Sequence, residues 1–139
     1  MAFDISSKLM SDDGQWTKLP SFGDAEFCIV RAADRSVRAG RQRILTRDYG
    51  RKASKGKMTA NDNVDLGLSV TAEYILLGWR GVSVGGDPVN YSVEKCLEFL
   101  EGVQGLLEEV SDYSLNDSNY LEAEKVAKKS GKPSPQAKE

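Results

Sequence analysis

Residues 25–48 read AEFCIVRAADRSVRAGRQRILTRD, and the pattern of this stretch changes at Asp34. Residues 25–33 form a short segment that is rich in aromatic and β-branched side chains, which is typical of a strand. Asp34 is suited to begin a helix, because its carboxylate can accept hydrogen bonds from the free N–H groups of a first turn. The stretch therefore predicts a strand followed directly by an arginine-rich segment over residues 35–48, which forms either a weakly anchored helix or an extended arm.

The residues upstream of this stretch predict a partner for the strand. Residues 15–19 (QWTKL) alternate their side chains as a strand does and end at Pro20. Residues 21–24 (SFGD) supply the Gly and Asp that a reversal of the chain favours. We expect residues 15–19 and 25–33 to pair as an N-terminal β-hairpin.

Downstream of the arginine-rich helix, we expect a loop and then a long helix. Residues 49–57 contain two glycines and four cations with almost nothing to bury, which indicates a loop. Residues 64–70 alternate like a strand, but residues 64, 68, 72, 75 and 79 also form a helical stripe of apolar side chains. Length favours one helix over residues 60–77.

The C-terminal half predicts further helices and a polar tail. Residues 78–91 fit a loop or a short pair of strands around the turn Gly-Gly-Asp-Pro, and Ser92 is suited to cap the next helix. A final helix is expected to start at residue 116 or 117. The polar sequence KKSGKPSPQAKE predicts a disordered tail over residues 128–139. The expected fold is α+β, with a small N-terminal β-hairpin, three or four helices, and a single domain over residues 1–127.

The composition of the chain argues against several kinds of chemistry. The 139 residues include no histidine, which excludes histidine bases and histidine metal ligands from this chain. The two cysteines, Cys28 and Cys96, lie among apolar neighbours and read as core residues rather than nucleophiles. The longest apolar run, residues 74–77, is far too short to span a membrane. We therefore expect no enzymatic activity, no cofactor, no metal and no membrane partner.

Charge is distributed unevenly along the chain. Residues 31–57 carry ten Lys and Arg against two Asp, a net charge of +8, whereas residues 58–139 carry seven basic and fourteen acidic residues, a net charge of −7. The arginines of the predicted helix are Arg35, Arg38, Arg41, Arg43 and Arg47. They are candidates for binding an acidic partner or the acidic half of a second copy.

A nucleic-acid partner is the alternative reading of the same cluster. Clustered cations bind phosphate backbones, so residues 35–57 could belong to a small nucleic-acid-binding regulatory protein. The sequence pI near 5.3 and the lack of aromatic residues within 35–48 argue against this alternative.

The stretch from Tyr74 to Leu100 contains the most specific motif of the sequence. A presumed helix leads into a Trp-x-Gly-Val unit, a glycine-containing turn with Pro-Val follows, and an aromatic-Ser-x-Glu helix start comes next. This pattern resembles the tail assembly chaperones of long-tailed phages, although Gly78 stands where the family often has an acidic residue. The residues that match the family pattern are Trp79, Gly81, Val82, Pro88, Val89, Tyr91, Ser92 and Glu94.

The resemblance implies a non-enzymatic protein that binds and solubilises the tape measure protein while the tail tube polymerises around it. It places the protein in the cytoplasm of the infected host and outside the mature virion. It also suggests contacts with the tail tube protein, self-association, and a longer frameshifted form, for which Lys128-Lys129 could mark the slippery codons. A structural component of the tail itself remains a further alternative.

Within this resemblance, particular residues take different expected roles. Trp79 and Tyr91 are expected to fix the glycine-rich loop on the helix that follows it. The weakly anchored helices over residues 35–48 and 117–129 are expected to offer adaptable binding surfaces, the second through Tyr120 and Leu121.

Overall fold

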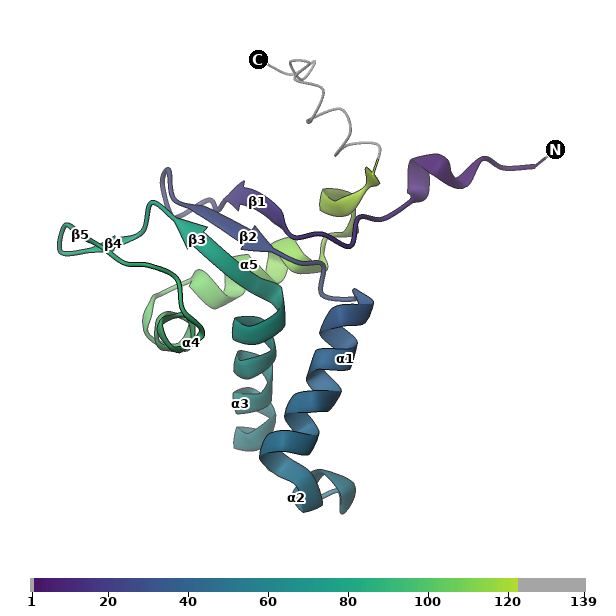
Figure 1. Ribbon diagram of the computed structural model, residues 1–139, viewed down its shortest axis with the longest axis vertical. Coiled ribbons are helices and arrows are strands. Elements are labelled where there is room, and N and C mark those ends of the chain that lie inside the picture. The colour runs from purple at the N-terminus through teal and green to yellow at the C-terminus, as the bar shows by residue number, and fades with distance from the viewer. Residues whose placement is uncertain (1, 123–139) are drawn as a thin grey trace.

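The computed structural model describes residues 2–122, which form a three-stranded antiparallel sheet supported by helices (Figure 1). The sheet order is β1-β2-β3, so the expected N-terminal hairpin supplies the first two strands. The α+β fold is confirmed. The strands are β1 (Gln15–Lys18), β2 (Glu26–Ile29) and β3 (Leu76–Arg80), and the longer helices are α1 (Arg35–Ile44), α3 (Ala60–Val70), α4 (Val93–Gly102) and α5 (Leu106–Leu115). A short 3-10 turn, η1 (Ile5–Lys8), precedes them.

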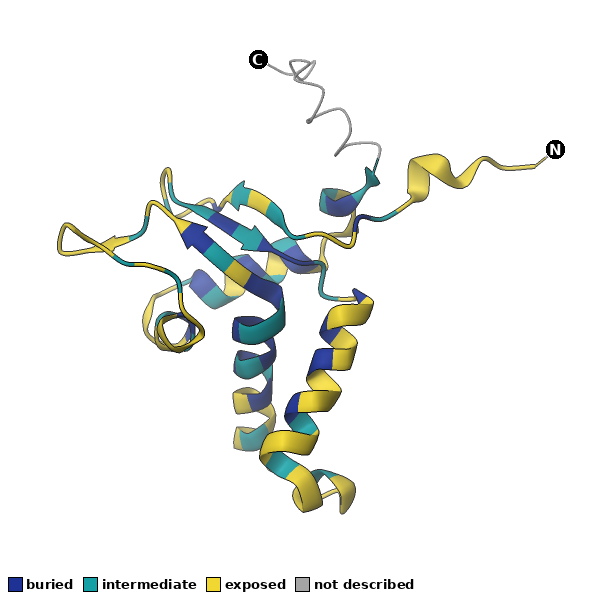
Figure 2. Cartoon of the chain, viewed as in Figure 1, coloured by how far each residue is buried: buried dark blue, intermediate teal, exposed yellow. Residues whose placement is uncertain are grey.

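Helices α1 and α3 run side by side away from the sheet, and one close approach holds them together (Figure 1). Asp34 caps α1 as predicted, because its carboxylate accepts a hydrogen bond of 3.0 Å from the Ser36 N–H. Val37 and Ile44 are buried on the inner side of α1, while its outer side is exposed (Figure 2). Gly40 lies directly beneath the ring of Tyr74, so this glycine is the position at which α1 comes close to the end of α3.

The loop expected at residues 49–57 is wrong for residues 49–54, which continue the helical chain, whereas residues 55–57 form a turn and a non-helical link. A π-helical turn, η2 (Leu45–Tyr49), follows α1, and a short helix, α2 (Gly50–Ser54), forms the lower end of the molecule. Two contacts hold the segment: Tyr49 packs against the hydrophobic core, and Lys52 pairs with Asp62 of α3 at 2.8 Å. Sequence composition alone does not reveal such an anchor.

The single helix expected over residues 60–77 is wrong at its C-terminal end. The helical run consists of α3 and a π-helical turn, η3 (Thr71–Ile75), and the chain then becomes β3 without a loop. Strand β3 pairs with β2, with Phe27 opposite Trp79 and an irregularity of the register between Cys28 and Ile29. The single hydroxyl proton of Tyr91 is shared between the carbonyl oxygens of Ala72 at 2.8 Å and Leu76 at 2.6 Å, where the helix ends.

The short pair of strands expected around Gly-Gly-Asp-Pro is present. Strands β4 (Ser83–Val84) and β5 (Asp87–Pro88) pair in antiparallel fashion. Gly85 and Gly86 connect them with φ values of 57° and 87°, as a two-residue hairpin turn of type I′ requires.

The C-terminal part of the described chain agrees with the prediction only in part. Ser92 caps α4 as expected, accepting a hydrogen bond of 3.0 Å from the Lys95 N–H. The helix predicted from residue 116 or 117 begins instead as a 3-10 turn, η4 (Asp117–Tyr120), because Leu121 forms a bridge with Met10. The rest of that predicted helix, the domain boundary at residue 127 and the predicted tail at 128–139 lie outside the described residues.

Both cysteines lie in apolar surroundings that suppress their reactivity. Cys96 is fully buried on α4, and burial raises its pKa to about 12. Cys28 is partly exposed on β2, where burial likewise raises its pKa above the usual value of 9.0, and the charge of Arg80 opposes this shift. Each thiol is therefore protonated, and a weak nucleophile, at neutral pH.

The contact between Gly40 and Tyr74 predicts opposite effects for two Gly→Ala substitutions. Gly40→Ala is expected to destabilise the fold by about 1–3 kcal/mol, because the added methyl group would overlap the Tyr74 ring. Gly67→Ala in α3 is the control, because nothing lies within 4 Å of the added atom. It is expected to stabilise the fold by about 0.5–1 kcal/mol through helix propensity. Urea unfolding followed by circular dichroism measures both, and equal effects would contradict the packing of α1 against η3.

The cysteine environments predict how the two thiols react with an aromatic disulfide reagent at pH 8. Cys96 is expected to react about a thousandfold more slowly than an ordinary thiol, because its raised pKa leaves that much less thiolate. Cys28 is expected to react at an intermediate rate, and both thiols at the free rate in urea. A Cys28→Ser variant isolates Cys96, and rapid labelling of this native variant would refute the burial of the thiol.

Candidate functional site

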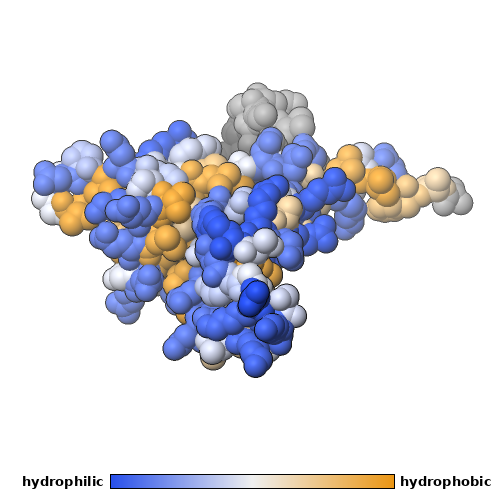
Figure 3. Space-filling view, turned by 60° about the horizontal axis from the view of Figure 1, so that its bottom comes forward, coloured by the Kyte–Doolittle hydropathy of each residue, from blue (hydrophilic) through white to orange (hydrophobic). Residues whose placement is uncertain are grey.

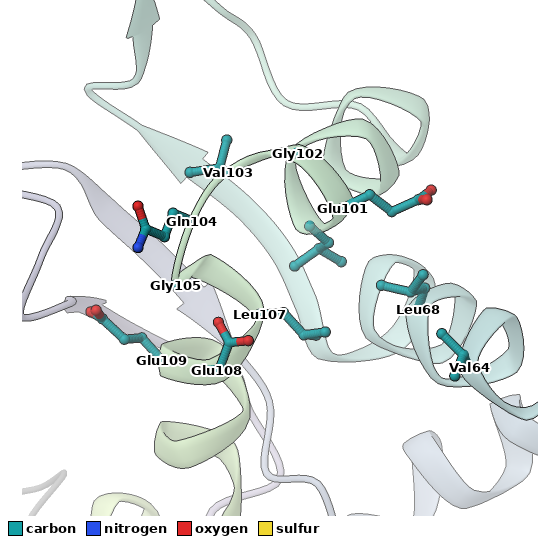
Figure 4. A pocket seen from close by; sticks show the side chains of 11 residues that line it. Val64, Leu68, Glu101, Gly102, Val103, Gln104, Gly105, Leu107, Glu108 and Glu109 are labelled. Carbon is teal, nitrogen blue, oxygen red and sulfur yellow. The ribbon is translucent and has the colours of Figure 1, made fainter.

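A shallow groove opens between α3, the end of α4 and the start of α5 (Figure 4). Its volume is about 820 Å³, and its floor is apolar, with Leu68 and Leu100 buried and Val64 exposed at 61%. Two glutamates stand at its rim, Glu101 at the end of α4 and Glu108 on α5. The remaining lining residues are Gly102, Val103, Gln104, Gly105, Leu107 and Glu109.

A smaller apolar pocket of about 280 Å³ adjoins the groove, because Val103 lines both. Its walls come from the hairpin loop, β2, β3 and α4, and they are mostly aromatic or aliphatic. Figure 3 shows hydrophobic residues gathered on the left of the view, on the side where β4, β5 and α4 lie in Figure 1. The pocket is lined by Phe22, Ala25, Phe27, Trp79, Gly81, Val82, Ser83, Val84, Phe99, Val103 and Leu106.

Trp79 is the centre of the motif residues and connects the sheet to α4. Its ring stacks on Phe99 with centroids 5.3 Å apart and meets the edge of Tyr91 at 4.9 Å. Its indole N–H donates to the carbonyl oxygen of Val89 at 2.8 Å, and the Val89 N–H donates to Val82. Trp79 therefore lies between the β4–β5 loop and α4, where it forms part of the pocket wall.

The other motif residues lie around this centre. Gly81 adopts φ of 77° directly after β3, and Pro88 is exposed in β5. Glu94 lies in the first turn of α4, exposed to solvent. Gly78, where an acidic residue was noted as common, faces the ring of Trp16, and a Cβ there would lie 3.4 Å from that ring. The side chain missing at 78 leaves room for Trp16 to lie across the outer face of the sheet.

The predicted partner-binding residues fall into three groups: arginines exposed on α1, an arginine engaged in ion pairs, and two residues of the C-terminal segment. Arg35, Arg38, Arg41 and Arg43 are exposed on α1. Arg47 is engaged within the chain, because it forms ion pairs with Asp48 and Glu73, each at 2.8 Å.

Tyr120 is fully buried, and its hydroxyl donates to the carbonyl oxygen of Ile29 at 3.1 Å. Leu121 is half-buried beside Met10. Tyr120 therefore secures the C-terminal segment to the sheet, and its side chain is not available to a partner.

Sequence reasoning missed the residues that make the groove. Val103 lies between Gly102 and Gly105, in the short link from α4 to α5, for which the sequence analysis predicted no site. Val64 was placed in the apolar stripe of the helix expected over residues 60–77, and Leu107 was given no role. The sequence did carry one signal for the groove: an apolar residue flanked by glycines between two amphipathic helices.

Neither a metal-binding cluster nor a membrane-spanning helix is found among the described residues. Residues 2–122 contain no group of three or more Cys, Asp or Glu side chains placed to hold a metal ion. No helix in the same part of the chain is long and apolar enough to cross a membrane.

Comparison with known proteins identifies a family for this chain. No curated protein and no solved structure matches the chain. The profile of the family described as YdaY prophage protein matches residues 34–131, a range that begins at the cap of α1 and contains α1 to α5. This range is well over half of the 139 residues. The chain therefore belongs to the YdaY prophage protein family and is of phage origin.

Proposed function

We propose that this protein is a phage tail assembly chaperone that binds and solubilises the tape measure protein during assembly of the tail tube. In this role it is not an enzyme, and it uses no cofactor. It acts in the cytoplasm of the infected host and leaves before the virion is complete. The phage origin of the family and the motif around Trp79 support the proposal.

The observation that carries the proposal is the apolar groove with its adjoining pocket. Val64 is exposed at 61% and Val103 at 36%, next to the buried Leu68 and Leu100 of the floor. Such a surface accepts the apolar stripe of an amphipathic helix, whose side chains recur at i, i+3, i+4 and i+7. The adjoining pocket is large enough for one bulky apolar side chain of that helix, held between Phe22 and Phe99.

The form of the groove also suits reversible binding. It is open to solvent, and Glu101 and Glu108 at its rim keep it hydrated when it is empty. One helix in an open groove binds weakly, but many copies along one long chain would hold it in solution by multivalency. Growth of the tail tube could then displace the copies one after another.

Co-expression with the tape measure protein of the same prophage tests this function. The wild-type chain should raise the soluble fraction of the tape measure protein. The double variant Val64→Asp, Val103→Asp should lower it to the level without the chain, because two carboxylates would lie in the apolar groove. Both side chains are partly exposed, so the stability of the variant should change by less than about 1 kcal/mol.

The double variant Leu9→Asp, Leu115→Asp is the matched control, because both leucines are exposed and neither lines the groove. It should act as the wild type does. A wild-type chain that leaves tape measure solubility unchanged would overturn the proposed function. Equal activity of the groove variant and the wild type would instead remove the groove as the binding site.

A further inference from the structure

The cations of α1, η2 and α2 greatly outnumber the acidic groups that could neutralise them. Residues 35–57 carry nine Lys and Arg against one Asp, a net charge of +8. Within the described chain, Arg47 and Lys52 are the members of this segment that form ion pairs. The remaining cations, which we call the basic surface, are all exposed: Arg35, Arg38, Arg41, Arg43, Arg51, Lys55 and Lys57.

An acidic counterpart lies on another side of the same molecule. Glu94, Glu98 and Glu101 follow one another at i, i+4 and i+7, so they share one exposed stripe of α4. Of these, Glu98 contacts Lys95 at 3.4 Å, and the other two form no ion pair with a described residue. We call this stripe the acidic surface.

The arrangement of the helices keeps the two surfaces apart. Helix α3 packs against α1 on one side and against α4 on the other, so it lies between the helices that carry the two charges (Figure 1). The outer side of α1 is exposed along its length (Figure 2). If a second copy were placed next to the outer side of α1 in the same orientation, its α4 would face the α1 of the first copy.

We propose that the basic surface of one copy binds the acidic surface of a second copy, so that copies associate head to tail. Each copy then keeps one free surface of each sign, and the association can continue into a ring or an open chain. Complementary charge sets the orientation and the rate of such encounters. The proposal does not depend on the ligand of the groove, so its failure would leave the chaperone role untouched.

The structure favours a second copy over nucleic acid as the partner of the basic surface. Proteins that bind single strands add aromatic side chains on which bases stack. The nearby aromatic residues are Tyr49 and Tyr74, which are half-buried, and the Tyr74 ring is occupied by its contact with Gly40. The required acidic surface, in contrast, is present on every copy.

Sedimentation velocity of the full chain tests the proposal after nuclease treatment. At low salt, about 50 mM, the wild type should form oligomers that grow with protein concentration. At about 500 mM salt the dissociation constant should rise at least about tenfold, because exposed charges are then screened. Arg35→Glu, Arg38→Glu and, separately, Glu94→Lys, Glu98→Lys should each be monomeric at the concentrations at which the wild type associates.

Mixing the two charge-reversed variants gives the decisive result. Each variant keeps one native surface, so the native acidic surface of one can bind the native basic surface of the other, and the introduced glutamates are complementary to the introduced lysines. An equimolar mixture should therefore associate again. Lys8→Glu, Lys18→Glu is the control: it changes net charge as the arginine variant does but lies outside both surfaces, and it should associate like the wild type. The proposal would be overturned if the wild type stays monomeric, if salt or charge reversal does not affect association, or if the mixture stays monomeric. It would also be overturned if the control loses association as the charge-reversed variants do, or if nuclease treatment abolishes association.

Discussion

The hydroxyl of Tyr91 lies against the carbonyl oxygens of Ala72 and Leu76, at the point where a helix turns directly into a strand. The last carbonyls of a helix have no partner within it, and leaving such a group buried and unpaired costs about 1–3 kcal/mol. Ala72 and Leu76 are fully buried, so water does not take this place. Burial also raises the pKa of Tyr91, which keeps the hydroxyl protonated as a donor. Tyr91 therefore permits a helix and a strand to follow each other without a loop.

The position of α4, and with it the groove, depends on this transition. Because β3 begins at once, Trp79 reaches the inner face of the sheet opposite Phe27. There its ring stacks on Phe99 of α4, four residues before Val103. The same tyrosine that satisfies the helix end also touches the edge of Trp79. The wall shared by the groove and the pocket is thus fixed to the sheet through two aromatic contacts.

Local signals predicted the parts of the fold that local chemistry determines. The β-hairpin, the caps at Asp34 and Ser92 and the glycine turn between β4 and β5 follow from side chains within a few residues. The stripe of residues 64, 68, 72, 75 and 79 misled in two ways. Val64 at its start is exposed, and Trp79 at its end belongs to a strand.

The true burial pattern of α3 explains why one stripe could not describe it. Leu66, Leu68 and Val70 are all buried, although they do not share one face of a helix, because α3 packs against both α1 and α4. A helix enclosed on two sides shows strand-like alternation in its sequence. The groove was not predicted for a related reason: its residues come from α3, α4, α5 and the link between the last two, and periodicity within one segment does not tell how closely these elements approach one another.

The family match covers the groove but not the N-terminal segment that forms part of the adjoining pocket. The matched residues begin at Asp34, so they contain every residue of the larger groove and both charged surfaces, but neither β1 nor β2. Strand β2 is nevertheless the middle strand of the sheet, and the smaller pocket takes Phe22, Ala25 and Phe27 from this N-terminal segment. The segment outside the match therefore has two structural roles. It completes the sheet on which Trp79 is positioned, and it forms one wall of the pocket. In a chaperone, substitutions at residues 22–27 could change which anchoring side chain is accepted while the groove and the charged surfaces stay as they are.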